Sequence, residues 1–393
     1  MTRSGTLLQQ GRFLIGQEFK ICDVRIVGST IADIDSHLAP FPNDVVVPLN
    51  GLCVVPGLIN SHDHLEFNLF SRVGEPPYAN YVDWSSDIQA HYKAQIRQVQ
   101  QIPLRLRLLW GAYKNIFSGV TTVVHHNPFY WQFRFGFPLE VYRPYTWIHS
   151  LRLEKRDLKK LITTNKSLCF IHLAEGTDQL ANGELKELSA LHGLNNLTVI
   201  IHGVGLSDSD LEEIVSVGCA IVWCPASNFY LFGKTAPIEK IIGKIPLVLG
   251  SDSTLTGSLS LFEEMRVAKE AKDLSSQNVL SLVTSSPAKL LNLCKGEITR
   301  GFKADLLIFE VKNDDPFRTI LSLSAAKVSC LLKNGVPIYG DAEIANLMGR
   351  SPRNQSNLKI ARFEKFVSGD FPRLLEQIKH FAPGLSLPNI LLQ

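Results

Sequence analysis

Two histidines one residue apart, His62 and His64, follow an apolar run that ends at Ile59. Residues i and i+2 of a β-strand project from the same face, so two imidazoles at this spacing can converge on one cation where the strand enters a pocket. A solvated turn can carry the same short motif without any metal. The pair therefore indicates a metal-binding strand end only if further ligand types gather beside it.

Residue types that bind metals recur directly after other apolar, strand-like runs. They are His125, His126, His172, His202 and Asp252, and Glu175 lies three residues beyond His172. The runs alternate with amphipathic helical stretches, which predicts a parallel sheet. A lone histidine at a strand end is more often a packed residue, but the active sites of parallel barrels lie at the carboxyl ends of their strands. So many coincident ligand types favour a shared site.

The alternating middle of the chain has the length expected of a (β/α)8 barrel. Both chain ends instead read as short strands separated by turns, with Asn334-Gly335 as a hairpin signal. We therefore predict three parts: residues 1–55 with 297–345 as a small β-sandwich domain, residues 56–296 as the barrel, and residues 346–393 as a C-terminal helical extension.

One stretch of the predicted barrel is short. Only 47 residues separate Val124 from His172, and they must hold the third and fourth strands with their helices. We expect the barrel to be abbreviated in this region.

Composition narrows the class of protein. The chain is 45% hydrophobic and 20% charged, which permits a large core. Its net charge of +3 gives no electrostatic case for nucleic acid as a partner. The sequence contains neither a signal-peptide core nor an apolar run long enough for a membrane span, so no membrane partner is expected. Seven cysteines without CxxC spacing predict reduced thiols and a cytoplasmic protein.

Taken together, the motifs resemble the amidohydrolase superfamily, specifically its aminohydrolase branch of cytosine, guanine and S-adenosylhomocysteine deaminases and triazine hydrolases. The resemblance spans most of the chain and rests on the motifs at residues 55–64, 119–122, 172–175, 202–207, 224–228, 250–252, 296–298 and 301–306.

The resemblance implies a site with one divalent metal ion. It assigns His62 and His64 to the first strand, His172 to the fifth and Asp252 to the eighth as ligands, leaving a position open for water. Zinc is the expected cation and iron the alternative. Binuclear relatives use a strand-end lysine to bridge two metals, and no lysine here occupies such a place.

The resemblance also implies catalytic roles for three residues. Glu175 is expected to shuttle protons between the metal-bound water and the substrate. His202 is expected to hydrogen-bond that water or the developing oxyanion, and Asp252 can also accept the proton of the water.

Substrate contacts are less specific in the sequence. We consider His125 or His126, Arg134, Arg143 and His149 as contacts, and Tyr81, Trp84 and Trp131 as either an aromatic wall or core packing.

The favoured function is hydrolytic deamination of an amino-substituted heterocycle, such as a nucleobase or nucleoside derivative. An alternative is hydrolysis of a cyclic or linear amide, or of a carbon–halogen bond, at the same site. A non-catalytic scaffold is the remote alternative, since such proteins typically lose metal ligands. The expected partner is a small-molecule substrate, and a homo-oligomer such as a dimer is left open.

Overall fold

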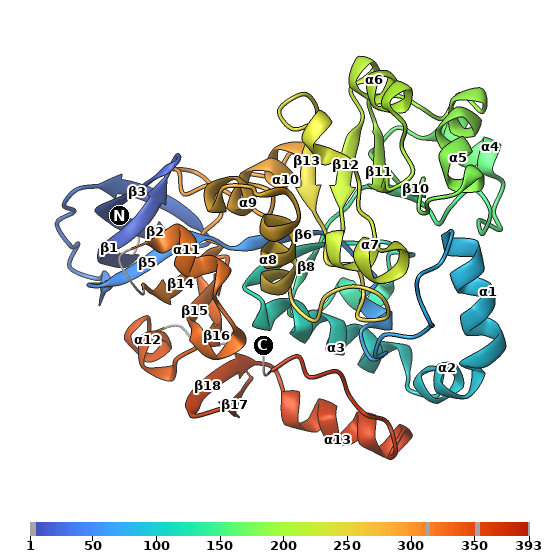
Figure 1. The fold of residues 1–393 in the computed structure, drawn as a ribbon. Coiled ribbons are helices and arrows are strands. Elements are labelled where there is room, and N and C mark those ends of the chain that lie inside the picture. Colours follow the sequence, from blue (N-terminus) through green and yellow to red (C-terminus); the bar gives the residue numbers. More distant parts are fainter. Residues whose placement is uncertain (1–4, 312–314, 350–353, 392–393) are drawn as a thin grey trace.

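The computed structural model of the protein describes residues 5–311, 315–349 and 354–391. In Figure 1 a β-rich part built from both chain ends lies beside a larger part in which strands and helices alternate. None of the helices in the described ranges is long and apolar enough to cross a membrane.

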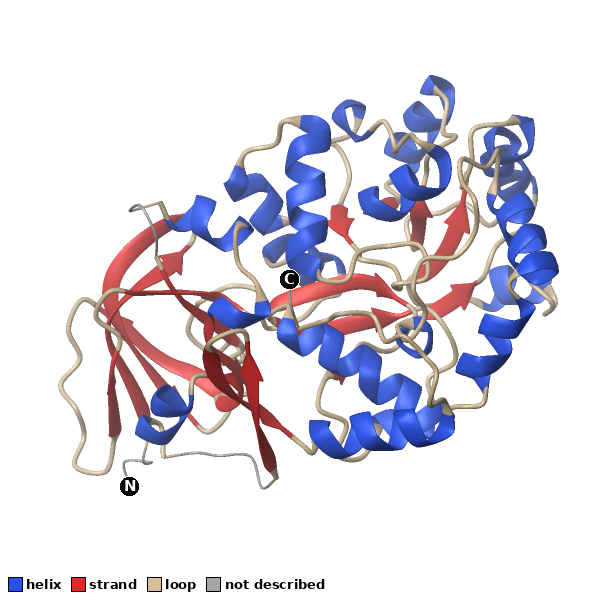
Figure 2. Ribbon diagram, turned by 60° about the horizontal axis from the view of Figure 1, so that its bottom comes forward, coloured by secondary structure: helices blue, strands red, loops and turns tan. Residues whose placement is uncertain are grey.

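The strands of the two chain ends form a separate sheet of ten strands. Their order is β17 (Gln355–Ile360), β18 (Phe363–Ser368), β16 (Val336–Gly340), β15 (Val328–Lys333), β14 (Leu306–Glu310), β5 (Leu52–Pro56), β1 (Thr6–Ile15), β2 (Glu18–Val27) and β3 (Thr30–Asp35), with β4 (Val45–Pro48) paired to β1. Where we expected a two-sheet sandwich, the hydrogen bonds run through one curved sheet (Figure 2). The curvature lets one sheet enclose an apolar cluster that includes Phe13, Val24 and Ile308.

The C-terminal region differs from the helical extension that we expected over 346–393. Residues 355–368 form the hairpin β17–β18, and β18 pairs with β16 at the edge of the sheet. Helix α13 (Phe371–Phe381) follows the hairpin and is the helical part of this region. An edge strand presents unpaired backbone groups, and β18 satisfies those of β16. The apolar residues Phe366 and Val367 are thereby buried in a strand and not on a helix.

The middle of the chain contains two groups of parallel strands. One group is β6 (Leu58–Asp63), β7 (Val120–His125) and β8 (Glu140–Val141), and the other is β13 (Leu247–Leu249), β12 (Ala220–Trp223), β11 (Thr198–His202), β10 (Cys169–Leu173) and β9 (Thr146–Ile148). The groups meet where β13 lies beside β6, through a hydrogen bond from Asp252 N to His62 O of 3.0 Å.

Helices surround these strands in both views (Figures 1 and 2). They are α1 (Tyr81–His91), α2 (Lys93–Gln100), α3 (Leu104–Phe117), α4 (Leu158–Thr164), α5 (Gln179–Ala190), α6 (Asp208–Val217), α7 (Pro225–Phe232), α8 (Leu261–Lys272), α9 (Ser276–Ser281) and α10 (Ser285–Leu290). The other helices are α11 (Pro316–Leu321) and α12 (Ala342–Leu347), and the short 3-10 turns are η1 (Leu65–Phe67), η2 (Trp131–Phe133), η3 (Ile238–Lys240) and η4 (Ala325–Lys327). The core between the strands holds residues such as Phe170, Ile201 and Val222.

The parallel strands are closely spaced along the chain in the interval that the sequence marked as short. Only residues 142–145 separate β8 from β9, and parallel neighbours need a crossover of about a dozen residues or more. The segment 140–148 therefore pairs with β7 at its start and with β10 at its end. One segment thus takes the place of two separate βα units.

A buried lysine joins the two parts of the molecule. Lys295 Nζ lies 2.8 Å from Asp305 Oδ2 before β14, 2.8 Å from Glu140 Oε2 of β8 and 3.0 Å from Thr122 Oγ1 of β7. The side chains of Lys295 and Asp305 are almost inaccessible to solvent. Each charge therefore depends on the other for compensation.

Replacing Lys295 with methionine is expected to lower the free energy of unfolding by about 3 to 5 kcal/mol, because Asp305 would remain buried without its cation. Urea denaturation followed by circular dichroism measures the change. Lys289 is exposed on α10, and Lys289→Met is the control that should leave the curve nearly unchanged. Identical urea denaturation curves for Lys295→Met and Lys289→Met would contradict the role assigned to the Lys295–Asp305 ion pair.

Candidate metal centre

Four strand ends bring ligand-type side chains to one place. The residues are His62 in β6, His64 just after it, His172 in β10, His202 in β11 and Asp252 just after β13. All are buried. Their ligand atoms form two overlapping groups, His62 with His172 and His202, and His62 with His64 and Asp252, each with its atoms within 4.8 Å of one another.

The distances suit one shared cation. His62 Nε2 lies 3.2 Å from His172 Nε2. Asp252 Oδ1 lies 3.8 Å from both His62 Nε2 and His64 Nε2. Two nitrogens bound to a tetrahedral zinc stand about 3.4 Å apart, given zinc–nitrogen bonds of about 2.0 to 2.1 Å. Of the predicted ligands, His62, His64 and Asp252 form one of these groups, and His62 and His172 form the other together with His202. Imidazole nitrogens and a carboxylate oxygen are donor types that zinc binds.

Hydrogen bonds orient two of the imidazoles. His172 Nδ1 donates to the His149 carbonyl oxygen at 2.6 Å, and His202 Nδ1 donates to Asn228 Oδ1 at 2.8 Å. In a neutral imidazole the other nitrogen, Nε2, then carries a lone pair. Both Nε2 atoms consequently face the cluster as acceptors, the state that a metal or an attacking water requires.

Burial determines the charge of the cluster. It lowers the pKa of His62 and His172 well below the ordinary value, and that of His64 to about 4, so these imidazoles are neutral at pH 7. Burial opposes ionisation of Asp252, but His64 and His202 nevertheless hold the pKa of this carboxyl below its ordinary value. The centre thus presents neutral nitrogens and an anionic oxygen.

Two of these residues have unusual backbone geometry. His202 has a φ of 72° and Asp252 a φ of 53°, in the left-handed region that non-glycine residues seldom adopt. Such strain persists only where the surroundings hold it, and it concentrates at functional sites. At both strand ends the left-handed turn lets the chain leave the strand while the side chain stays at the cluster.

Glu175 lies beside His202, with Oε1 3.6 Å from His202 Nε2. Burial raises the pKa of Glu175 well above its ordinary value, and the Asp252 and Glu184 carboxylates raise it further. Burial thus favours the protonated form of the Glu175 carboxyl, the form that can donate a proton.

The cluster lies in a pocket with apolar and aromatic walls. The wall residues include Phe67, Tyr81, Trp84, Leu153 and Leu255, and the His149 side chain also reaches the pocket. Of the substrate contacts that we considered, His149 is thus at the pocket, as are the aromatic rings of Tyr81 and Trp84.

Other predicted contacts lie elsewhere. His126 is buried against the rings of His62, His64 and His172, and its Nε2 donates to the Ile148 carbonyl oxygen. His125 points away from the pocket, toward Tyr130 and Phe133, because consecutive strand residues face opposite sides. Arg134, Arg143 and Trp131 are exposed and do not line the pocket.

The structure adds Glu184 and Thr256, which the sequence did not single out, and shows a contact for Ser227 of the 224–228 motif. Glu184 of α5 accepts hydrogen bonds from Ala174 N at 2.8 Å and from the Tyr81 hydroxyl at 2.6 Å. It therefore supports the loop that carries Glu175. Ser227 and Thr256 each donate to Asp252 Oδ2 at 2.9 Å. The contact of Ser227 with Asp252 spans 25 residues and that of Glu184 with Tyr81 spans 103 residues, so neither is visible in the local sequence.

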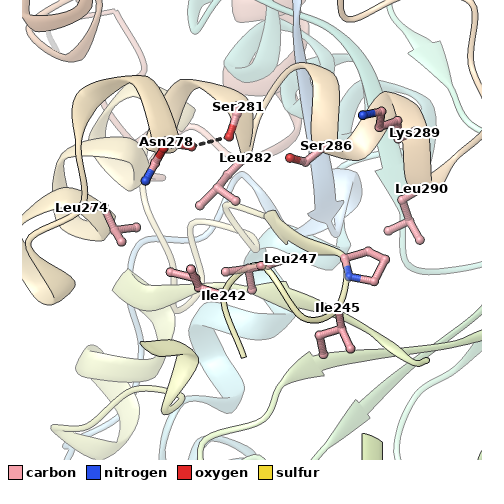
Figure 3. Close-up of a pocket in the computed structure, with 12 residues that line it drawn as sticks. Ile242, Ile245, Leu247, Leu274, Asn278, Ser281, Leu282, Ser286, Lys289 and Leu290 are labelled. Carbon is pink, nitrogen blue, oxygen red and sulfur yellow. Dashed lines mark hydrogen bonds between the residues drawn. The ribbon is translucent and has the colours of Figure 1, made fainter. Parts of the chain in front are cut away.

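A second hollow lies at the opposite end of β13 (Figure 3). It is lined by Ile245 and Leu247, at the start of the strand that leads to Asp252, and by residues of α9 and α10. Its lining contains no histidine, cysteine or carboxylate. The hydrolytic chemistry is therefore assigned to the histidine-lined pocket.

Comparison with known proteins agrees with this site. The sequence model of the amidohydrolase family matches residues 164–340, which include His172, His202 and Asp252. A 5-methylthioadenosine/S-adenosylhomocysteine deaminase of Pyrococcus abyssi is 23% identical, over 88% of this chain and 96% of the relative.

Solved structures agree in fold over almost the whole chain. An adenosine deaminase from Xanthomonas campestris with bound zinc has a TM-score of 0.71 at 15% identity, covering 98% of this chain and 99% of that one. An atrazine chlorohydrolase from Arthrobacter aurescens TC1 complexed with zinc has a TM-score of 0.73 at 16% identity, covering 96% and 100%. The α/β fold of this chain is thus that of zinc-binding hydrolases.

The Glu184 contacts predict a pH-dependent stability. Burial raises the pKa of Glu184 to about 7, so the native state binds a proton more tightly than the unfolded state between about pH 4.5 and 7. Wild-type stability should lose this contribution as pH rises through that window. Glu184→Gln removes the titration, so its stability relative to wild type should rise between pH 5 and pH 8, by as much as about 3 kcal/mol.

Urea denaturation at the two pH values measures this difference. Glu212 is exposed on α6, and Glu212→Gln is the control that should show no such trend. A constant difference between Glu184→Gln and wild type would refute the role assigned to burial.

Proposed function

We propose that this chain, a member of the amidohydrolase family, is a metal-dependent deaminase that replaces the amino group of an adenosine derivative with oxygen. The observation that carries the proposal is the meeting of His64, His172 and His202 with the carboxyl groups of Asp252 and Glu175 in one pocket. Deaminases of 5-methylthioadenosine and S-adenosylhomocysteine, and of 5'-deoxyadenosine, are among its relatives at 22 to 25% identity.

His62, His64, His172 and Asp252 would hold the cation, with zinc as the expected metal and iron as the alternative. When bound, the cation lowers the pKa of a water molecule toward about 7 and so supplies a nucleophile at neutral pH. Neutral imidazoles are available for ligation without losing a proton, which favours binding at this pH.

Glu175 and His202 would move and orient protons beside the substrate. Glu175 would donate its proton to the ring nitrogen next to the carbon under attack, take up a proton from the attacking water, and then pass that proton to the departing amine. His202 accepts a hydrogen bond from the attacking water through Nε2, since its Nδ1 is engaged by Asn228. Asp252 Oδ1 can also accept the proton of that water, while Ser227 and Thr256 hold its other oxygen.

The pocket walls suit a flat heterocycle. Trp84, Tyr81 and Phe67 offer aromatic surface, and Leu153 and Leu255 offer aliphatic surface. His149 is the proposed polar contact to the substrate, because its carbonyl oxygen already accepts from His172 and fixes its place at the pocket.

Hydrolysis of a carbon–halogen bond is the second candidate, because the fold also matches an atrazine chlorohydrolase. Both reactions use the same water and the same ligands. The leaving group distinguishes them, as ammonia or as halide. A cytoplasmic location and a homo-oligomeric state remain predictions from the sequence.

Zinc-loaded protein is expected to release ammonia from 5'-methylthioadenosine, S-adenosylhomocysteine or 5'-deoxyadenosine. Mass spectrometry of the product should show oxygen in place of the amino group. Treatment with a chelator should abolish release and added zinc should restore it, because the water needs the cation for activation. The same assay is run with pyrimidines, guanine, pterins and chlorinated triazines as alternative substrates. Ammonia release that survives complete metal removal would exclude the proposed chemistry.

Glu175→Gln should lower kcat by about 10²- to 10⁴-fold, because the amide cannot transfer the proton. Zinc content should stay at the wild-type level, since Glu175 is outside the ligand set. Glu187 is half-buried on α5, where it pairs with Arg152 and does not line the pocket, so Glu187→Gln serves as the matched control with normal turnover. Wild-type turnover in Glu175→Gln would mean that another group carries the proton.

A further inference from the structure

A buried lysine lies directly behind the metal centre. Lys114 of α3 is 1% exposed, and its ammonium group contacts two different strand ends. Nζ lies 3.3 Å from Asp63 Oδ2, 3.0 Å from Ser251 Oγ and 2.9 Å from the Asp252 carbonyl oxygen. All three donor positions of the ammonium group are therefore used.

On one side, Lys114 holds the strand that carries two of the proposed ligands. Asp63 stands between His62 and His64, and strand alternation turns its side chain away from the metal centre. Its carboxylate is fully buried and also accepts from Asn68 Nδ2 and Asn115 Nδ2, each at 2.8 Å. An ionised carboxylate at this depth requires a cation, and Lys114 is the group that supplies it.

On the other side, Lys114 holds the turn that carries Asp252, the carboxylate of the proposed ligand set. Asp252 has a left-handed backbone, and its carbonyl oxygen accepts from both Lys114 Nζ and Ser251 Oγ. Its amide donates to the His62 carbonyl oxygen. The strained turn is thus held at two points. The Asp252 amide bonds to β6, and the Asp252 carbonyl oxygen bonds to Lys114 of α3.

We propose that Lys114 is a positioning residue of the metal centre, which sets the separation between the two-histidine strand and the Asp252 turn. Asp252 Oδ1 can then lie equidistant from His62 Nε2 and His64 Nε2, at 3.8 Å from each. The inference rests on the proposed function, because it concerns the residues assigned there as ligands.

A buried ion pair could also stabilise the fold without positioning any ligand. The test therefore separates a positioning role of Lys114 from a purely structural one. Lys114→Met removes the charge and the three donors, and Lys295→Met breaks another buried ion pair, whose residues do not line the pocket. The double variant Asp63→Asn with Lys114→Met removes both charges of the Lys114 pair. It keeps the test decisive if Lys114→Met alone does not fold.

Zinc affinity is measured by competition with a chromogenic chelator, with folding checked by circular dichroism. We expect zinc binding to be about 10- to 100-fold weaker in Lys114→Met and in the double variant, and unchanged in Lys295→Met, as for partners that orient metal ligands. The double variant with wild-type affinity would show that Lys114 only neutralises Asp63, and would overturn the inference. Equal losses in Lys114→Met and Lys295→Met would overturn it too.

The wild-type protein separates this inference from the proposed function. If wild-type protein binds no zinc, the proposed function fails before any variant is compared. If wild-type protein binds zinc and the Lys114 variants bind it equally well, the proposed function stands and the positioning role fails.

Discussion

The hydrogen bond from the Asp252 amide to the His62 carbonyl oxygen joins the two groups of parallel strands at the metal centre. It brings the end of β13 beside the end of β6, and so places the only carboxylate of the proposed ligand set against two imidazoles. The other contributions come from β10 and β11, whose ends point to the same side because all these strands are parallel. The centre is therefore a product of strand direction more than of any local motif.

The energetic difficulty of such a centre is the burial of many polar groups. Each polar group that leaves water needs a partner, and most of them here have one that is supplied by the protein. His172 and His202 donate to oxygen atoms, Asp252 accepts from two hydroxyl groups, and Asp63 is paired with Lys114. The Nε2 atoms of His172 and His202, whose Nδ1 atoms are engaged, remain available to a cation or a water.

The fold was predictable where local periodicity and tertiary environment agree. The runs before His172, His202 and Asp252 became β10, β11 and β13, because their apolar residues are buried between sheet and helices. The prediction was wrong over residues 355–368, where apolar residues compatible with a helix form a hairpin on the sheet edge. These residues form a hairpin instead of a helix because the edge of β16 is available for pairing, and no local pattern of residues reveals that edge. The shortness of the 124–172 interval was visible in advance, but the use of one segment for two strands was not.

The types of the candidate ligand residues, their order and their position after apolar strands are properties of the sequence alone. Through the resemblance to the amidohydrolase superfamily they predict His62, His64, His172 and Asp252 as ligands of one metal. Which way each neighbour turns was decided only by the tertiary structure. His125 and His126 are adjacent in the chain, yet one packs away from the centre and the other against it. Lys114 looks like any lysine of a helix, and its importance arises from two strand ends that are 51 and 138 residues away. Chemistry is encoded by residue type, whereas orientation and charge compensation depend on contacts that exist only after the chain has folded.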